Sequence, residues 1–114
     1  MNAWKEIFLH LKKEFDIYSP GQKEGKCNTP YIVLKDNGQN NMVNNKVGYK
    51  VMDLIFFIPL NNYSCIEDYK KKIKLSIKEL NFIRPTGNES PIFIDEDRSA
   101  HTGSIEYIIH KKLN

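Results

Sequence analysis

Arginine, cysteine and tryptophan are scarce in this chain, and its charge is close to balanced. Arginine occurs at two of the 114 positions and tryptophan at one. The net charge is only +3, from 17 basic and 14 acidic residues, whereas nucleic-acid binders usually have a concentrated basic face and a pI above about 9. The two cysteines form no metal-binding or redox motif, so we expect free thiols in a reducing compartment.

Long hydrophobic runs and phosphate-binding loops are also missing. No apolar stretch approaches the roughly 20 residues that a membrane-spanning helix needs. The N-terminal stretch "MNAWKEIFLHLKKEF" is interrupted by charge throughout, so it predicts an amphipathic helix and no signal peptide. The glycines do not have the spacing of a phosphate loop. We therefore expect a soluble intracellular protein that does not contact membranes.

The apolar content is sufficient for one folded domain that spans residues 1–114. Hydrophobic residues make up 40% of the chain and aromatic residues 11%, more than a disordered chain contains. A chain of this length is typical of a single core. We therefore expect one domain.

Apolar periodicity predicts two helices and about four strands. The helices are expected at about residues 2–15 and after Ser64. The strands are expected in the stretches "TPYIVLKD", "GYKVMDLIFFIP", "PIFID" and "HTGSIEYIIHKKL". The order α-β-β-α-β-β, with short connections between the strands of each pair, predicts an α+β fold. Its small, mostly antiparallel sheet would be flanked by the two helices.

The second predicted strand is apolar on both faces. Met52, Leu54, Phe56 and Ile58 point to one side, and Tyr49, Val51, Asp53, Ile55 and Phe57 point to the other. A sheet covered on one face only should carry polar residues on the second set, but Asp53 is the only polar one. Either the first helix covers this second face within the monomer, or another subunit does.

The second predicted helix carries five lysines outside its apolar stripe. Ser64 and Glu67 have the spacing of a capping box. Lysines at positions 70, 71, 72, 74 and 78 are best interpreted as a solvated face whose long side chains cover the edge of the core. A contact with the acidic turn Asp95-Glu96-Asp97 of a neighbouring subunit ranks second, and a phosphate contact ranks third.

No catalytic or metal-binding constellation is evident. His10, His101 and His110 are far apart, and neither cysteine lies in a familiar nucleophile context. The acidic stretch "DEDRSAH" is more simply a solvated turn than a cation site, because it lacks a defined metal-binding pattern. We therefore expect no enzyme, no cofactor and no metal. The asparagine-rich segment, with Asn40, Asn41, Asn44 and Asn45, predicts an exposed connection.

Three stretches together resemble a known family: "CNTPYIVLKDNG", "VGYKVMDLIFFIPLNNYSCIEDYKKKIKLSIKEL" and "SPIFIDEDRSAHTGSIEYIIHKKL". Their order and spacing, over roughly residues 27–112, resemble the small tail-terminator or tail-completion proteins of tailed phages, prophages and phage-tail-like bacteriocins. The shared pattern is a Pro-Tyr strand, a long strand ending in proline, a tyrosine-containing spacer into a helix, and a terminal strand of the "SIEY" type.

The resemblance implies a structural role in a virion or tail-like particle, assembled in the bacterial cytoplasm. Such proteins form a ring, commonly of six subunits, that caps the head-proximal end of the tail tube and stops its polymerisation. The implied partners are copies of the chain itself, the tube protein, and the sheath and neck proteins. No catalytic residues come with the family.

A ring needs two complementary surfaces on each subunit. For the subunit interface we predict Tyr49, Val51, Ile55, Phe57, Lys70, Lys71, Lys74, Asp95, Glu96 and Asp97. For a tube or neck contact we predict Asn40, Asn41, Asn44 and Asn45. A head-closure or neck adaptor of the same particle is the first alternative. A small nucleic-acid-binding module that uses the lysines of the second helix is the alternative from a different class.

Overall fold

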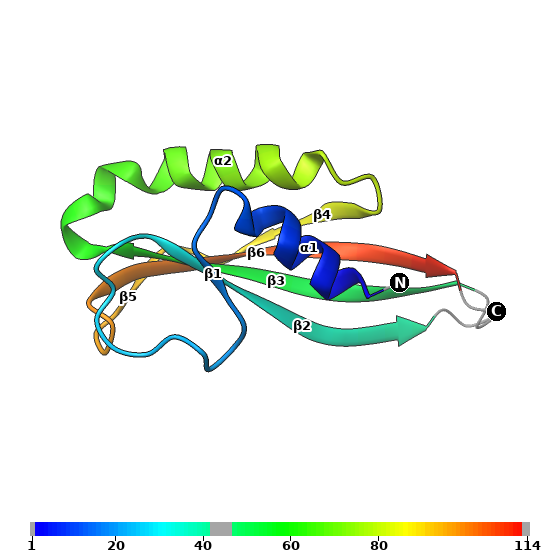
Figure 1. Ribbon diagram of the computed structural model, residues 1–114, viewed down its shortest axis with the longest axis horizontal. Coiled ribbons are helices and arrows are strands. Elements are labelled where there is room, and N and C mark those ends of the chain that lie inside the picture. The colour runs from blue at the N-terminus through cyan, green and yellow to red at the C-terminus, as the bar shows by residue number, and fades with distance from the viewer. Residues whose placement is uncertain (1, 42–46, 113–114) are drawn as a thin grey trace.

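The protein is built on one twisted sheet with two helices (Figure 1). The computed structural model describes residues 2–41 and 47–112. The elements are α1 (Ala3–Lys12), β1 (Ile17–Tyr18), β2 (Tyr31–Asn41), β3 (Val47–Pro59), the 3₁₀ helix η1 (Leu60–Cys65), α2 (Ile66–Lys78), β4 (Ile83–Glu89), β5 (Phe93–Asp95) and β6 (Ala100–Lys112).

The sheet has six strands in the order β1-β2-β3-β6-β4, with β5 also paired to β6. Only the short β1–β2 pair is parallel; the other pairs are antiparallel. In the central pair, β3 and β6 keep one register from Val47 opposite Lys112 to Pro59 opposite Ala100. The predicted α+β class and the mostly antiparallel sheet are confirmed, with six strands where about four were expected.

The two additional strands are short or irregular, which explains why periodicity does not reveal them. β1 has two residues. β4 has the sequence "IRPTGNE", in which only Ile83 is buried, and its register against β6 shifts between Pro85 and Glu89. Proline and glycine are tolerated on such an edge strand because one side of its backbone needs no ladder partner. This segment, for which the sequence predicted no element, is therefore an edge strand with a bulge.

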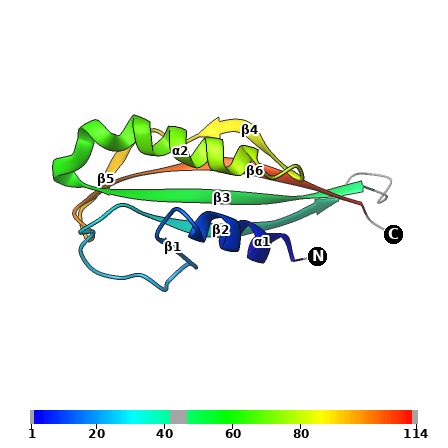
Figure 2. The same cartoon turned by 45° about the horizontal axis from the view of Figure 1, so that its top comes forward.

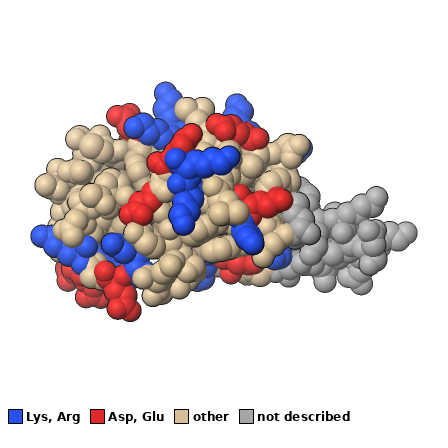
Figure 3. Space-filling model, viewed as in Figure 1, with Lys and Arg blue, Asp and Glu red and all other residues tan. Residues whose placement is uncertain are grey.

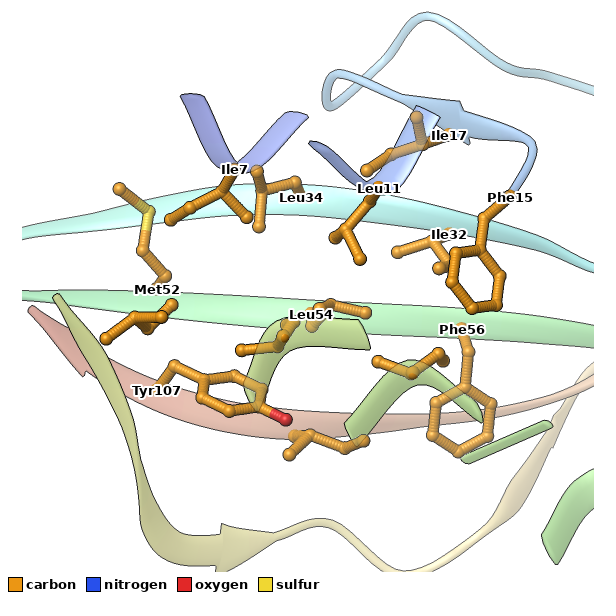
Figure 4. Close-up of a cluster of buried hydrophobic side chains, with 14 of the residues drawn as sticks. Ile7, Leu11, Phe15, Ile17, Ile32, Leu34, Met52, Leu54, Phe56 and Tyr107 are labelled. Atoms are coloured by element: carbon orange, nitrogen blue, oxygen red, sulfur yellow. The ribbon is translucent and has the colours of Figure 1, made fainter. Parts of the chain in front are cut away.

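Both helices lie on the same face of the sheet (Figure 2). Ile7 and Leu11 of α1 belong to one buried cluster with Leu54 of β3 and Ile73 and Ile77 of α2. Figure 4 shows the α1 side chains directed towards those of β2 and β3. The possibility that α1 covers the second face of the sheet is therefore wrong. Helix α1 packs on the first face because its own apolar stripe matches the fully buried side of β3.

The start of α2 also differs from the prediction. The 3₁₀ helix η1 continues directly into α2, so Cys65 is the N-cap residue and makes no capping hydrogen bond through its side chain. The predicted capping box of Ser64 and Glu67 is therefore wrong. Glu67 and Asp68 still lie in the first turn, where negative charge interacts favourably with the helix dipole.

Close packing around Gly103 of β6 gives a test of the core. A Cβ atom added there would lie 2.8 Å from Cζ of Phe56 and 3.0 Å from Cδ1 of Ile92. We expect Gly103→Ala to lower the free energy of unfolding by about 1–3 kcal/mol through overpacking, measured by urea denaturation. The neighbouring Ser104→Ala, on the other face, should change it by less than about 0.5 kcal/mol.

A double variant tests whether the contact with Phe56 causes the destabilisation expected for Gly103→Ala. Phe56→Leu should destabilise less in the Gly103→Ala background than in the wild type, since the clash is with the phenyl ring. Additive effects would contradict this account.

Candidate functional site

Four apolar side chains form a patch on the face of the sheet opposite the helices. Val33 of β2 lies opposite Ile55 of β3, and Val51 of β3 lies opposite Ile108 of β6. All four are half-buried. Within residues 2–41 and 47–112 no helix covers this face. We call Val33, Val51, Ile55 and Ile108 the open-face patch.

Polar groups are interleaved with the open-face patch. Asp53 lies between Lys35 and Glu106 in the three-stranded register and accepts a hydrogen bond from the Asn37 side-chain amide. Hydrogen bonds from Asn88 and Thr86 hold the pKa of Glu106 below its usual value. A surface of this mixed composition is typical of a contact between proteins that are also stable apart.

Phe57, the largest predicted interface residue, belongs to the chain's own packing. Its ring stacks on that of Tyr31 with centroids 4.8 Å apart, and the Arg98 guanidinium lies 5.2 Å from the Phe57 ring centroid. Cys27, from the loop between β1 and β2, completes this buried cluster. Phe57 is 8% exposed, so it offers little surface to a partner. Of the other predicted residues on this strand face, Val51 and Ile55 are accessible, and the Tyr49 side chain lies outside the described part of the structure.

Two of the three predicted interface lysines already have a partner in the same chain. Lys70 Nζ lies 2.8 Å from Oε1 of Glu89, and Lys74 Nζ lies 2.6 Å from its Oε2. Hydrogen bonds from these two lysines lower the pKa of Glu89. Lys71, like Lys72 and Lys78 on the same helix, is exposed. The sequence did not reveal this bridge, because the strand that carries Glu89 was not predicted.

In the predicted acidic turn between β5 and β6, one carboxylate is already hydrogen-bonded within the chain. Asp95 Oδ2 accepts a hydrogen bond from the Arg98 guanidinium at 3.0 Å, and Asp95 Oδ1 accepts one from the Arg98 backbone at 3.2 Å. Glu96 and Asp97 are exposed. The preceding Phe93 and Ile94 are apolar but 57% and 55% exposed. The turn therefore combines apolar and acidic groups at the surface.

A cavity of about 540 Å³ lies between α2 and β4, and we call it the α2–β4 cavity. Four apolar residues line it, and its charged lining consists of three cations and Glu89. The apolar residues are Ile77, Ile83, Pro85 and Tyr107; the cations are Lys74, Lys78 and Arg84. Burial raises the pKa of the Tyr107 phenol to about 12, so this group is neutral at physiological pH. Sequence analysis missed the cavity because one wall is β4, the strand that it did not predict.

His10 and His101, the two histidines whose side chains the structure describes, have separate partners. His10 Nε2 lies 2.8 Å from the Ser76 carbonyl oxygen, and His101 Nε2 lies 3.2 Å from that of Leu60. Among the described residues no group of three or more His, Cys, Asp or Glu side chains is placed to hold a metal ion. None of the described helices has both the length and the apolarity to cross a membrane.

The predicted asparagine contacts are only partly visible. Asn40 and Asn41 belong to the end of β2, opposite Tyr49 and Gly48 of β3. Asn44 and Asn45 lie outside the described residues. The contact role of these four asparagines stays a prediction.

Comparison with known proteins assigns no family. No protein-family model matches the chain, and a search of curated proteins gave no match. The surfaces described above are therefore the basis for any functional proposal.

The bridge between α2 and β4 predicts a pH dependence. Because Glu89 has a lowered pKa in the folded protein, its stabilising contribution is complete above the ordinary carboxyl pKa of 4.5. That contribution is lost as the pH falls through the lower, folded-state value. We expect Glu89→Gln to be less stable than wild type at pH 7, with a difference that shrinks below about pH 4.5 and at high salt.

Thermal unfolding at several pH values measures this difference. Glu24→Gln is the matched control, because Glu24 is exposed and forms no ion pair with another described residue. A Glu89→Gln difference that stays constant from pH 7 to pH 3 would contradict the assignment.

Proposed function

We propose that this protein is a structural subunit that assembles with copies of itself into a ring at the head-proximal end of a phage-type tail tube. The observation that carries the proposal is the open-face patch at the centre of the sheet. It adds a structural argument to the sequence resemblance to tail-terminator proteins.

The open-face patch is a suitable contact surface because of where it lies. Val51 and Ile55 belong to β3, the central strand, which is flanked by β2 and β6 along its length. The patch is therefore backed by the main core and needs no rearrangement to bind a partner. Covering half-exposed apolar side chains contributes about 25 cal/mol for each Å² removed from water. A neighbouring subunit that covers this face would gain that free energy.

The shape of the molecule also suits an assembled ring. The protein is elongated, with principal extents of 48 × 25 × 24 Å. The ends of β2, β3 and β6 extend past both helices (Figure 1). Such a projection gives each subunit a part that can reach a tube or neck protein while the open-face patch contacts a neighbour.

The nucleic-acid alternative is less well supported by the charges. Lys70 and Lys74 are bridged to Glu89, which removes part of the basic character of α2. Figure 3 shows acidic side chains among the basic ones over the helical side of the molecule. Nucleic-acid binding depends on a basic surface that can release several counterions from the phosphates. No continuous surface of this kind is visible on the face in Figure 3.

Light scattering and electron microscopy test the proposal. We expect the purified protein to form a ring of about six copies, either alone or when isolated tail tubes are added, with density at one end of each tube. A monomer that ignores tubes would overturn the proposal. Density at the neck of complete particles but never on isolated tubes would instead identify a neck adaptor.

Charge placed in the open-face patch should block this assembly. We expect Ile55→Asp to weaken self-association at least about tenfold, equivalent to about 1.4 kcal/mol, and to leave the circular dichroism spectrum unchanged. Leu9→Asp on α1 is the matched control, since Leu9 is 52% exposed and lies on the helical side. Equal effects of the two variants would exclude the open-face patch as the contact.

A further inference from the structure

Strand β5 exposes apolar side chains that the rest of the chain does not cover, and an acidic turn follows it. Phe93 and Ile94 are more than half exposed, although β5 is paired with β6. Exposed Glu96 and Asp97 follow directly. No ion-pair partner for either carboxylate is found among the described residues. We call residues 93–97 the β5 turn.

The α2–β4 cavity complements the β5 turn. Its lining is partly apolar, like the turn, but mostly basic where the turn is acidic. Its volume of about 540 Å³ lies in the range of about 300–1,000 Å³ that is usual for binding sites. Lys74 is bridged to Glu89. Lys78 and Arg84 have no acidic partner among the described residues. A ligand with an apolar anchor and one or two carboxylates would match both features.

We propose that the α2–β4 cavity receives the β5 turn of a second copy of this chain. The Phe93 ring enters the apolar part formed by Ile77, Ile83 and Pro85. The carboxylates of Glu96 and Asp97 meet Lys78 and Arg84. The inference rests on the proposed function only in taking another copy of the chain as the partner. It adds a second contact, separate from the open-face patch.

Two properties favour another copy as the occupant. An aromatic residue that inserts into a cavity is a typical anchor of a protein interface, and Phe93 is such a residue with little packing of its own. Charges at the rim of the contact then fix orientation and speed association more than they add affinity. Lys78 and Arg84 are placed to fix the orientation of the contact and to speed association.

The geometry makes this contact heterologous. The β5 turn and the α2–β4 cavity lie at different places on the molecule: β5 is at the left end in Figure 1, and α2 runs with β4 towards the right. A copy that inserts its turn into a neighbour keeps its own cavity free for the next copy. Repetition of one such contact closes a ring or extends a filament.

Charge reversal with mixing tests the pairing. One variant carries Lys78→Glu and Arg84→Glu; the other carries Glu96→Lys and Asp97→Lys. Each alone should associate at least about tenfold more weakly than wild type, because cavity and turn then have the same sign. An equimolar mixture should recover association, since every contact between the two variants is again between opposite charges.

The control for charge alone is a single charge reversal on α2 outside the cavity lining. Lys72→Glu lies on the same helix but does not line the cavity, so it should associate like wild type. Association that is unchanged in both reversed variants would overturn the inference.

A disulfide cross-link tests the contact directly. Cys65 is exposed and Cys27 is buried, so Cys65→Ser supplies a background without an accessible thiol. In that background, Lys78→Cys with Asp97→Cys should give a ladder of covalent oligomers under mild oxidation. Each single cysteine variant, and the pair Lys72→Cys with Asp97→Cys, should give no ladder beyond a dimer.

The outcomes separate this inference from the proposed function. Rings at tube ends without a ladder or mixing effect would overturn the cavity contact and leave the terminator proposal standing. A ladder with mixing recovery but no binding to tubes would support the contact and count against the terminator. A protein that stays monomeric, with no ladder and no binding to tubes, would overturn both the cavity contact and the terminator proposal. Binding of an unrelated acidic peptide in place of the β5 turn, with no self-association, would also overturn the inference.

Discussion

The uninterrupted ladder between β3 and β6 fixes the surfaces of this protein. The two strands pair from Val47 opposite Lys112 to Pro59 opposite Ala100 without a bulge. Side chains alternate strictly along a strand, so a slip of one residue would exchange the two faces of the whole sheet. The ladder places Met52, Leu54 and Phe56 on the helical side and leaves Val51 and Ile55 on the other. Both the core and the open-face patch depend on this one register.

Features on both sides of the sheet disfavour pairing with an added strand. On one edge, β4 is bulged at Gly87 and contains Pro85, features that discourage pairing with another strand. On the other edge, the indole Nε1 of Trp4 donates a hydrogen bond to the Leu34 carbonyl oxygen at 2.8 Å. Helix α1 thus satisfies a backbone acceptor that would otherwise face a neighbouring chain. In the proposed assembly, side-chain contacts and not added strands would therefore join the subunits.

The sequence predicted the long elements well, because their periodicity directly reflects burial. Both helices, and the strands β2, β3 and β6, follow from apolar patterns, and the predicted face of β6 is buried at Ile105, Tyr107 and Ile109. The surfaces were predicted less well. Phe57 has the pattern of a free apolar residue, but its cover comes from Arg98 and from a polar loop without periodicity. The cavity beside α2 could not be predicted, since it depends on an edge strand that has almost no apolar pattern.

Two of the lysines on α2 are paired within the chain, and a third, Lys78, lines the cavity without such a partner among the described residues. Lys70 and Lys74 are held by Glu89, which joins the middle of the helix to β4 and keeps one wall of the cavity in place. Lys78, one turn further on, also lines the cavity and is exposed. Surface ion pairs contribute only about 0–1 kcal/mol each, so the bridge positions the wall more than it stabilises the fold. The Glu89 carboxylate therefore offsets one of the two positive charges of Lys70 and Lys74. Lys78 is left where, in the proposed contact, an acidic group of the second copy would orient it.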